Sequence, residues 1–285
     1  MPKTNLTDKI LIMEKPQPFL SIPNAIIVGS LIISISILIS GGIIKIGSRT
    51  TGTQANTATV SPSAQPAAQQ ASPQPTVTLA QVKEVFNKSQ VKLGDVNGKL
   101  VVIEAADPSC PFCHVAAGKN PELNKQIGSR FTLVADGGTY VAPVPELKKL
   151  VDDGKAAFAW IYTPGHGNGE MGAKALYCAN EKGKFWEVHD LLMSSKGYDL
   201  LNNQVKNDKT KSGDMADFLS GVFDSATMKT CLDSGKYDSR LTEDVALAQS
   251  LGISGTPGFY LNNKGFAGAY SYKDMESTVK TALGI

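Results

Sequence analysis

The hydrophobic and polar positions divide the chain into stretches of different character. Residues 16–44 contain no charged side chain, and residues 25–44 consist of isoleucine, leucine and valine interrupted only by serine, glycine and one alanine. Twenty residues of α-helix are about 30 Å long, which matches the hydrocarbon layer of a bilayer. We therefore expect a single transmembrane anchor at residues 22–46, preceded by a cytoplasmic segment at residues 1–21.

The flanks of this apolar run bear on its processing and orientation. Lys3, Lys9 and Lys15 precede it, as in a secretory signal, but the run exceeds a usual signal core and no Ala-x-Ala pattern follows. An uncleaved anchor is therefore favoured over a cleaved signal, and the lack of an amphipathic stripe disfavours a buried core helix. The three lysines favour a cytoplasmic N-terminus, whereas Lys45 and Arg49 on the other flank oppose it.

A polar stretch separates the apolar run from the rest of the chain. Residues 47–78 carry one charge, on Arg49, and are rich in threonine, glutamine, alanine, serine and proline. Such a composition buries too little apolar surface to offset the entropy lost on ordering. We expect a flexible linker here, followed by one globular domain at residues 79–285.

Within residues 79–285 the patterns predict strands and helices in alternation. Apolar runs predict strands at residues 100–105, 131–135, 156–162, 258–261 and 266–270. Helices are predicted at residues 79–88, 110–127 and 272–283, with helical patterns at residues 172–192, 214–219 and 244–251. The order is strand, helix, strand, a helical insertion at about residues 165–250, a hairpin and a closing helix, which is typical of an α/β fold.

Composition narrows the range of functions. The 28 lysine and arginine residues against 26 aspartate and glutamate residues leave a formal charge of +2, too small a basic excess for a nucleic-acid partner. Four cysteines are too few for a small disulfide-stapled protein, and two of them form a Cys-x-x-Cys motif. Redox or metal chemistry at this motif is therefore the leading question.

The motif is Cys110-Pro111-Phe112-Cys113, directly after a predicted strand and at the start of a predicted helix. Pro111 suits the first helical position, where its missing N–H has no partner to lose. The helix N-terminus favours negative charge, so the pKa of Cys110 should be lowered and its sulfur should be the better attacking and leaving group. Cys113 can then attack a mixed disulfide between Cys110 and a substrate.

Three other interpretations of the motif stay open. Cys110 and Cys113 followed by His114 also form the attachment signature of c-type haem. A zinc site would need further cysteine or histidine ligands at a suitable spacing, and no second Cys-x-x-Cys supplies them. A purely structural disulfide at this spacing closes a very short loop and stabilises little. Each is less favoured than a redox pair.

Two further positions complete the candidate site. Glu104 lies in the apolar run of residues 101–105; burial would raise its pKa and let it exchange a proton with Cys113, unless it faces solvent on an edge strand. Pro257 precedes a predicted strand, where proline is tolerated at the first position. A cis Thr256–Pro257 bond would fit, although few such bonds are cis.

Glu104, the Cys110–Cys113 motif, the helical stretch at residues 177–190 and Ser254-Gly255-Thr256-Pro257 follow one another at fitting distances. With these motifs the chain resembles the DsbA-like thiol:disulfide oxidoreductases of the thioredoxin superfamily over most of residues 99–285. The resemblance implies a thioredoxin-like fold with an inserted helical subdomain, and activity without a cofactor or metal.

The resemblance also implies roles for individual residues. Cys110 would attack and Cys113 resolve, Glu104 would be the buried acid, Pro257 the cis-proline, and Thr256, Pro111 and Phe112 would contact the substrate chain. Phe112 departs from the family, in which a histidine is best known at this position, so His114 is the candidate for positive charge nearby. Residues 130–145 read as an insertion without an assigned role.

Cys178 and Cys231 remain, 53 residues apart. In an oxidising compartment they would pair as a structural bridge across the helical subdomain, and two separate buried thiols are the equal alternative. The sequence spacing does not decide between them.

The expected function is that of a membrane-anchored, extracytoplasmic thiol:disulfide oxidoreductase that donates the Cys110–Cys113 disulfide to exported proteins with free thiols. The resemblance alone implies a reoxidising membrane partner of the DsbB or VKOR type. A reductase or isomerase of the same fold is the first alternative. A thioredoxin-like binding module with purely structural cysteines is the second.

Overall fold

The structure is a computed structural model that describes residues 76–285. The anchor expected at residues 22–46 and nearly all of the linker expected at residues 47–78 lie outside the described residues. Within residues 76–285, no helix is both long and apolar enough to span a membrane.

A five-stranded mixed sheet forms the centre of the domain, in the order β1-β3-β2-β4-β5. Its strands are β1 (Val91–Leu93), β2 (Leu100–Ala106), β3 (Ala156–Tyr162), β4 (Gly258–Leu261) and β5 (Lys264–Ala267). β2 and β3 run parallel, and the other neighbouring pairs are antiparallel. Every residue of β2 and β3 is buried, which is why both read as continuous apolar runs rather than as alternating patterns.

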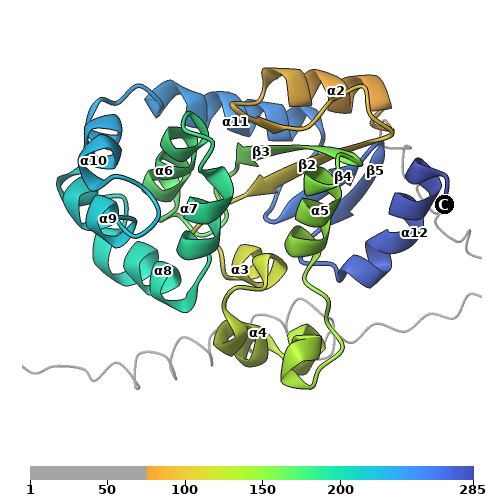
Figure 1. Cartoon of the computed structure of the whole chain (residues 1–285), viewed down its shortest axis with the longest axis horizontal. Coiled ribbons are helices and arrows are strands. Elements are labelled where there is room, and N and C mark those ends of the chain that lie inside the picture. The colour runs from red at the N-terminus through yellow and green to blue at the C-terminus, as the bar shows by residue number, and fades with distance from the viewer. Residues whose placement is uncertain (1–75) are drawn as a thin grey trace, which may run out of the picture. The chain divides into compact units, whose positions relative to one another are not determined.

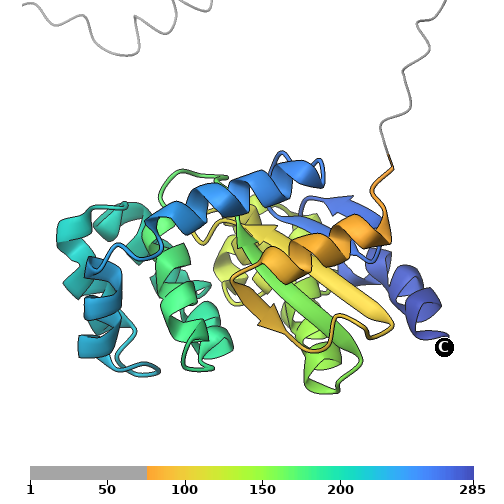
Figure 2. The same ribbon diagram turned by 90° about the horizontal axis from the view of Figure 1, so that it is seen from above.

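Helices cover both faces of this sheet (Figure 2). On one face lie α2 (Leu79–Lys88) and α11 (Asp238–Ser250), whose apolar residues share a core with Ile103 and Ile161. The other face packs against α3, α5, α12 and the inserted helices, and its core includes Trp160. Outside the insertion, the helices after β2 are α3 (Pro111–Ala117), α4 (Pro121–Ile127), α5 (Pro143–Asp152) and α12 (Tyr272–Leu283).

All of the regular secondary structure between β3 and β4 is helical. In Figure 1 most of this stretch lies to one side of the sheet. It contains α6 (Glu170–Asn180), α7 (Phe185–Leu192), α8 (Ser195–Asp199), the π-helix η3 (Leu200–Val205), the 3-10 helix η4 (Lys209–Lys211), α9 (Ser212–Phe218) and α10 (Ser225–Asp233). The last helix of the stretch, α11, instead returns to the sheet, where it packs on β3.

The strand predicted at residues 131–135 is wrong. The chain there forms two short 3-10 helices, η1 (Ser129–Phe131) and η2 (Val134–Asp136), because its backbone N–H groups bond to carbonyls only three residues back. Gly137 ends the second at φ 84°, a conformation that glycine adopts without strain. A single bridge between Leu133 and Tyr140 is all that resembles sheet pairing in this segment.

The single helix predicted at residues 110–127 is two helices. Gly118 ends α3 in the left-handed conformation at φ 65°. The side chain of Asn120 then caps α4, whose first residue is Pro121. β1, α5, α8 and α10 are not among the elements that the sequence patterns predict, and the strand predicted at residues 266–270 occupies Lys264–Ala267 instead. The other predicted strands and the helices at residues 79–88 and 272–283 are confirmed.

Candidate active site

The Cys-x-x-Cys motif lies where β2 ends and α3 begins. Cys110 is the N-cap residue of α3, and Pro111 occupies the first turn, as the sequence predicts. Both Cys110 and Cys113 are free thiols here, 4% and 1% exposed. Cys113 sits one turn into the helix, so its sulfur turns toward the core, where the backbone N–H of Asp107 donates to it at 3.4 Å.

The sulfur of Cys110 is surrounded by groups that favour its thiolate. The hydrogen bond from the Cys113 thiol is the largest influence and lowers the pKa of Cys110 to about 6, against the opposing effect of burial. Thr256 and the backbone N–H groups of Phe112 and Cys113 lower the pKa of Cys110 further. A large share of Cys110 is therefore thiolate at neutral pH.

Cys113 titrates in the opposite direction. Burial raises the pKa of the Cys113 thiol well above its ordinary value, and the neighbouring charges of Cys110 and Glu104 raise it further. The two sulfurs of one motif therefore have very different acidities. One thiol is ready to leave as a thiolate, and the other holds its proton.

Glu104 lies in the middle of the sheet rather than at its edge. Its strand β2 is hydrogen-bonded to β3 and β4, and its neighbours across the two ladders are Trp160 and Phe259. The side chain is 1% exposed, and its Oε2 has no hydrogen-bond partner among the described residues. Burial raises the pKa of Glu104 to about 8, so the carboxyl group is mostly protonated at neutral pH.

The loop before β4 brings a distant part of the chain to Cys110. The Thr256–Pro257 bond is cis, and the carbonyl of Thr256 lies 3.6 Å from the sulfur of Cys110. The structure thus places together four of the candidate residues, Glu104, Cys110, Cys113 and Thr256, from three separate segments. Phe112 is 39% exposed beside them.

Asp107 is a site residue that the sequence analysis missed. It is fully buried in the turn between β2 and α3, and one of its carboxylate oxygens accepts from the backbone N–H and hydroxyl of Ser109. The other accepts from the backbone N–H groups of Gly165 and His166, both at less than 3 Å. An aspartate two residues before a serine is an Asx-turn signal that could have drawn attention to it.

Asp107 thereby holds the loop at residues 164–168 against the active-site turn. A β-carbon on Gly165 would lie 1.8 Å from the hydroxyl of Thr256 and 3.4 Å from the β-carbon of Cys110. Asn168 adds a bond from its backbone N–H to the Ser109 hydroxyl at 3.1 Å. The loop therefore packs directly beside Cys110 and Thr256. Only glycine fits at position 165, because any β-carbon there would overlap the Thr256 hydroxyl.

His114 does not supply positive charge. Its ring is fully buried, and burial lowers the pKa of His114 to about 4, so it is neutral at physiological pH. The two ring nitrogens lie 2.9 Å from the Met193 carbonyl and 2.8 Å from the Pro108 carbonyl. The ring thus links the active-site turn to the end of α7, and neither nitrogen is free to ligate iron as the haem interpretation requires.

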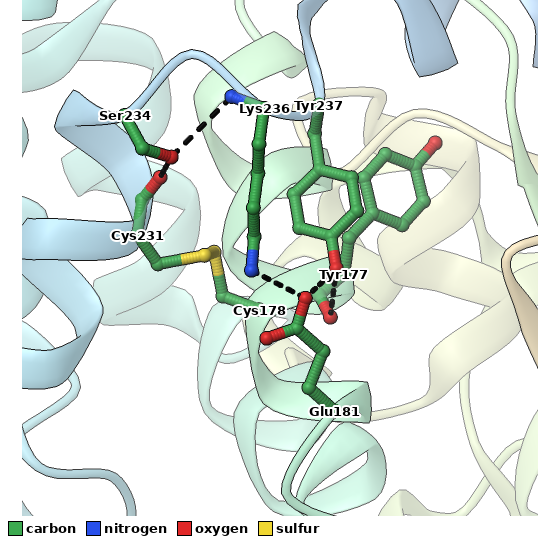
Figure 3. Close-up of a disulfide and its surroundings, with 7 residues drawn as sticks. All are labelled: Tyr177, Cys178, Glu181, Cys231, Ser234, Lys236 and Tyr237. Carbon is green, nitrogen blue, oxygen red and sulfur yellow. Dashed lines mark hydrogen bonds and ion pairs between the residues drawn. A yellow bond between two sulfur atoms is a disulfide. The ribbon is translucent and has the colours of Figure 1, made fainter.

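The remaining cysteines form a disulfide. Cys178 of α6 and Cys231 of α10 are bonded, with 6.2 Å between their α-carbons (Figure 3). Nearby, Lys236 and the hydroxyl of Tyr237 both donate to the carboxylate of Glu181. Neither sulfur is available to complete a zinc site with the Cys110 pair, and residues 76–285 contain no group of three or more histidine, cysteine or acidic residues arranged for a metal ion.

Comparison with known proteins agrees with this architecture. A family model described as thioredoxin matches residues 143–281, which include Pro257 but begin after Cys113. The solved structure of oxidised BdbD from Bacillus subtilis superposes with a TM-score of 0.51 at 21% identity, covering 70% of this chain and 95% of that one. The domain has a thioredoxin-like fold. α-DsbA1 of Wolbachia pipientis shares the thioredoxin-like fold, with a TM-score of 0.52, 20% identity and coverage of 71% and 96%.

Two curated proteins match the sequence at 25% identity. The disulfide bond formation protein D of Bacillus subtilis is 25% identical over 202 residues, which are 69% of this chain and 78% of that protein. The Na(+)/H(+) antiporter NhaA 3 of Salinispora tropica is also 25% identical, over 194 residues. The chain covers 67% of its own length in that match but spans only about a quarter, 24%, of the antiporter.

Proposed function

We propose that the protein is an extracytoplasmic thiol:disulfide oxidoreductase that introduces disulfides into exported proteins. The observation that carries this proposal is the unequal pair of sulfurs beside the Thr256 carbonyl. Cys110 has a pKa of about 6, whereas the pKa of buried Cys113 is raised. A low pKa on the attacking cysteine stabilises the reduced form, which makes the disulfide form a stronger oxidant.

The reaction proceeds through a mixed disulfide. In the oxidised protein a substrate thiolate attacks the sulfur of Cys110, which forms the substrate–Cys110 bond and breaks the Cys110–Cys113 bond, and Cys113 leaves with the electron pair. The Cys113 thiolate is a poor leaving group because its pKa is raised, and the protonated carboxyl group of Glu104 supplies a proton to it. A second substrate thiolate then attacks the substrate sulfur of the mixed disulfide, and Cys110 leaves as its stabilised thiolate. The substrate has lost two electrons and the protein has gained them.

The location and partners belong to the same proposal. The Cys178–Cys231 disulfide supports an extracytoplasmic site, because such structural bridges form and persist in oxidising compartments. The apolar run at residues 22–46 would hold the domain at the periplasmic or extracellular face of the cell membrane. A membrane protein of the DsbB or VKOR type would accept the two electrons from the reduced pair.

The proposal is tested by measuring the reduction potential of the Cys110–Cys113 pair, with the protein equilibrated in glutathione buffers. A reduction potential near the value of about −120 mV known for DsbA supports the oxidase, and one near about −270 mV, the thioredoxin value, moves the protein to the reductase or isomerase alternative. The Cys178→Ala/Cys231→Ala variant assigns the couple to the Cys110 pair. If no reversible two-electron couple is found while a Cys110→Ser variant still retains bound partners, the binding-module alternative replaces the enzyme.

A further inference from the structure

We propose that Asn202, which lies in the π-helix η3 of the inserted helices, is a positioning residue for thiol–disulfide exchange at Cys110. Its side chain fixes the backbone turn that carries Cys110, and it acts on the reacting sulfur only through that turn. The inference rests on the proposed function and goes beyond it, because it gives the inserted helices a part in the reaction.

The side chain of Asn202 joins η3 to two distant segments of the chain. Its Nδ2 donates to the carbonyl of Ser109, directly before Cys110, and to the carbonyl of Tyr198, both at 3.1 Å. Its Oδ1 accepts from Nδ2 of Asn168 at 3.2 Å. With the amide turned by 180°, Oδ1 would face both carbonyl oxygens, so these partners fix which way the amide points.

The carbonyl of Ser109 depends on this amide. Ser109 is fully buried, and within residues 76–285 the Asn202 amide is the only group that donates a hydrogen bond to its carbonyl. A buried carbonyl without a donor is unfavourable, because it has lost water and gained no protein partner. Without Asn202, the turn would therefore shift to bring this carbonyl to water or to another donor.

A shift of this kind would move the reacting sulfur. The peptide group between Ser109 and Cys110 is held at both ends, because the N–H of Cys110 donates to the Asp107 carbonyl at 3.0 Å while the Ser109 carbonyl accepts from Asn202. A planar peptide group that is bonded at its oxygen and at its nitrogen cannot rotate freely. Its orientation sets the direction of the Cys110 side chain, and with it the 3.6 Å contact between the Cys110 sulfur and the Thr256 carbonyl.

The same amide also holds the loop at residues 164–168. Asn168 bonds to Asn202 through its side chain and donates its backbone N–H to the Ser109 hydroxyl at 3.1 Å. The side chain of Asn207, just after η3, donates to the Gly167 carbonyl at 2.9 Å. η3 and the residues directly after it are therefore bonded to the loop that packs beside Cys110.

Neighbouring residues bring η3 close to the cysteine motif. The ring of Tyr198 in α8 packs edge to face against the buried ring of His114, with 4.8 Å between ring centroids. A β-carbon on buried Gly197 would lie 2.1 Å from the Leu192 carbonyl oxygen, so α8 comes this close to α7 only with glycine at that position. The inserted helices thus contact the motif on both sides, at Ser109 before it and at His114 after it.

η3 contains three amide side chains, and they differ in what they contact. Asn203 and Gln204 are exposed and donate to Asp199, in the same α8–η3 segment. Only Asn202 bonds to residues outside that segment. π-helices are rare and frequently occur at functional sites. Asn203 therefore provides a matched control for Asn202 in the same short helix.

The test compares the oxidised full-length wild type with Asn202→Ala and Asn203→Ala in stopped-flow oxidation of a reduced unfolded protein. Asn202→Ala should react about tenfold more slowly, because a displacement of the reacting sulfur by less than 1 Å is enough for this loss. The midpoint of alkylation by iodoacetamide should rise above the wild-type value near pH 6, because the sulfur moves away from the groups that stabilise its thiolate. Asn203→Ala should keep the wild-type values of both quantities.

A second variant covers the case in which Asn202→Ala does not fold. Asn202→Leu has nearly the same shape but no polar atom, and the folded protein should show the same slow exchange and raised midpoint. A merely structural role of Asn202 would lower the unfolding free energy in urea and leave the exchange rate and the alkylation midpoint of the folded protein unchanged. That result would overturn the inference, and so would an equal loss of rate in Asn203→Ala.

The glutathione equilibrium separates the two proposals. If the wild type has a reversible two-electron couple and Asn202→Ala exchanges as fast as the wild type, the redox function stands and the role of Asn202 is wrong. If the wild type has no such couple, the proposed function fails, and the positioning role fails with it.

Discussion

Gly165 and Thr256 meet directly beside Cys110, although 90 residues separate them in the sequence. A β-carbon on Gly165 would come within 1.8 Å of the Thr256 hydroxyl. The contact exists because the buried carboxylate of Asp107 accepts from the backbone N–H groups of Gly165 and His166. The loop that carries Thr256 is therefore opposed by a loop that Asp107 fixes to the same turn as Cys110.

We expect Gly165→Ala to slow disulfide exchange with protein thiols. The new β-carbon requires Thr256 or the loop to move by more than 1 Å, and a displacement of about that size costs about a hundredfold in rate. Stopped-flow oxidation of a reduced unfolded protein measures the effect. Gly165→Ala/Thr256→Ala removes the hydroxyl that clashes and should recover part of the loss.

Gly221→Ala is the control for this substitution, because a β-carbon at Gly221 meets nothing within 4 Å. It should retain the wild-type rate. A Gly165→Ala protein that reacts as fast as the wild type would contradict the close contact at Cys110.

The pKa of Cys110 predicts how the stability of the reduced protein depends on pH. The folded pKa of about 6 lies below the ordinary value of 9.0, so the thiolate stabilises the fold fully above pH 9, and this contribution is lost as the pH falls to 6. Between these values the unfolding free energy of the reduced form should rise relative to that of the oxidised form by about 1.4 kcal/mol per pH unit.

Urea unfolding of both redox forms between pH 5 and 8.5 measures this difference, and alkylation of the reduced protein by iodoacetamide should show a midpoint near pH 6. Reduced Cys110→Ser lacks the titrating group and should lose the slope. A reduced-minus-oxidised difference that does not change with pH would contradict the lowered pKa.

Glu104 predicts a slope of the opposite sign in the oxidised protein. Its pKa is raised from 4.5 to about 8, so the protonated carboxyl group stabilises the fold fully below pH 4.5, and this contribution is lost as the pH rises to 8. The unfolding free energy of oxidised wild type should therefore fall relative to oxidised Glu104→Gln by about 1.4 kcal/mol per pH unit across this window. Urea unfolding of both proteins at each pH measures this difference. If the two unfolding free energies change with pH in the same way, Glu104 is ionised in the folded protein and the prediction is wrong.

The Cys178–Cys231 disulfide should stabilise the fold without taking part in exchange. It closes a loop across a sequence separation of 53 residues between α6 and α10, for which chain entropy gives a stabilisation of about 4 kcal/mol. Cys178→Ala/Cys231→Ala should lower the unfolding free energy by about this amount in urea. The reduction potential of the Cys110 pair should stay the same, and a shifted potential would show that the two disulfides are coupled.

The elements that the sequence predicts correctly can be recognised from the pattern of their own residues alone. The apolar runs at β2 and β3 can be recognised without knowledge of their neighbours, and so can the spacing of four residues between Met275, Val279 and Leu283 in α12. Buried parallel strands and amphipathic helices have these patterns. Residues 131–135 mislead because they form a short, largely apolar run, but Phe131 and Leu133 pack into a small separate core with Val115 and Ala142 rather than into the sheet. Periodicity alone does not distinguish these two destinations.

The candidate site divides in the same way. The motif, its place at a helix start, and a buried acid before it are local facts, so the lowered pKa of Cys110 and the raised pKa of Glu104 could both be predicted in direction. From its position in the sequence His114 is a candidate for positive charge, but burial lowers the pKa of His114 to about 4 and keeps the ring neutral, although the Pro108 and Met193 carbonyls act in the opposite direction. Burial of a helix side chain depends on what packs over it, in this case α7 and α8.

By itself, the sequence of this protein determined that Cys110 and Cys113 follow a buried strand and lie at the start of a helix, because secondary structure and the helix N-terminus are set by residues close to one another in the chain. Only the tertiary structure decided that Cys178 bonds to Cys231, that Asp107 holds Gly165 against Thr256, and that Phe131 and Tyr140 line a depression together with Thr256. Each of these depends on distances between residues far apart in the sequence, and the packing of the sheet and its helices sets those distances.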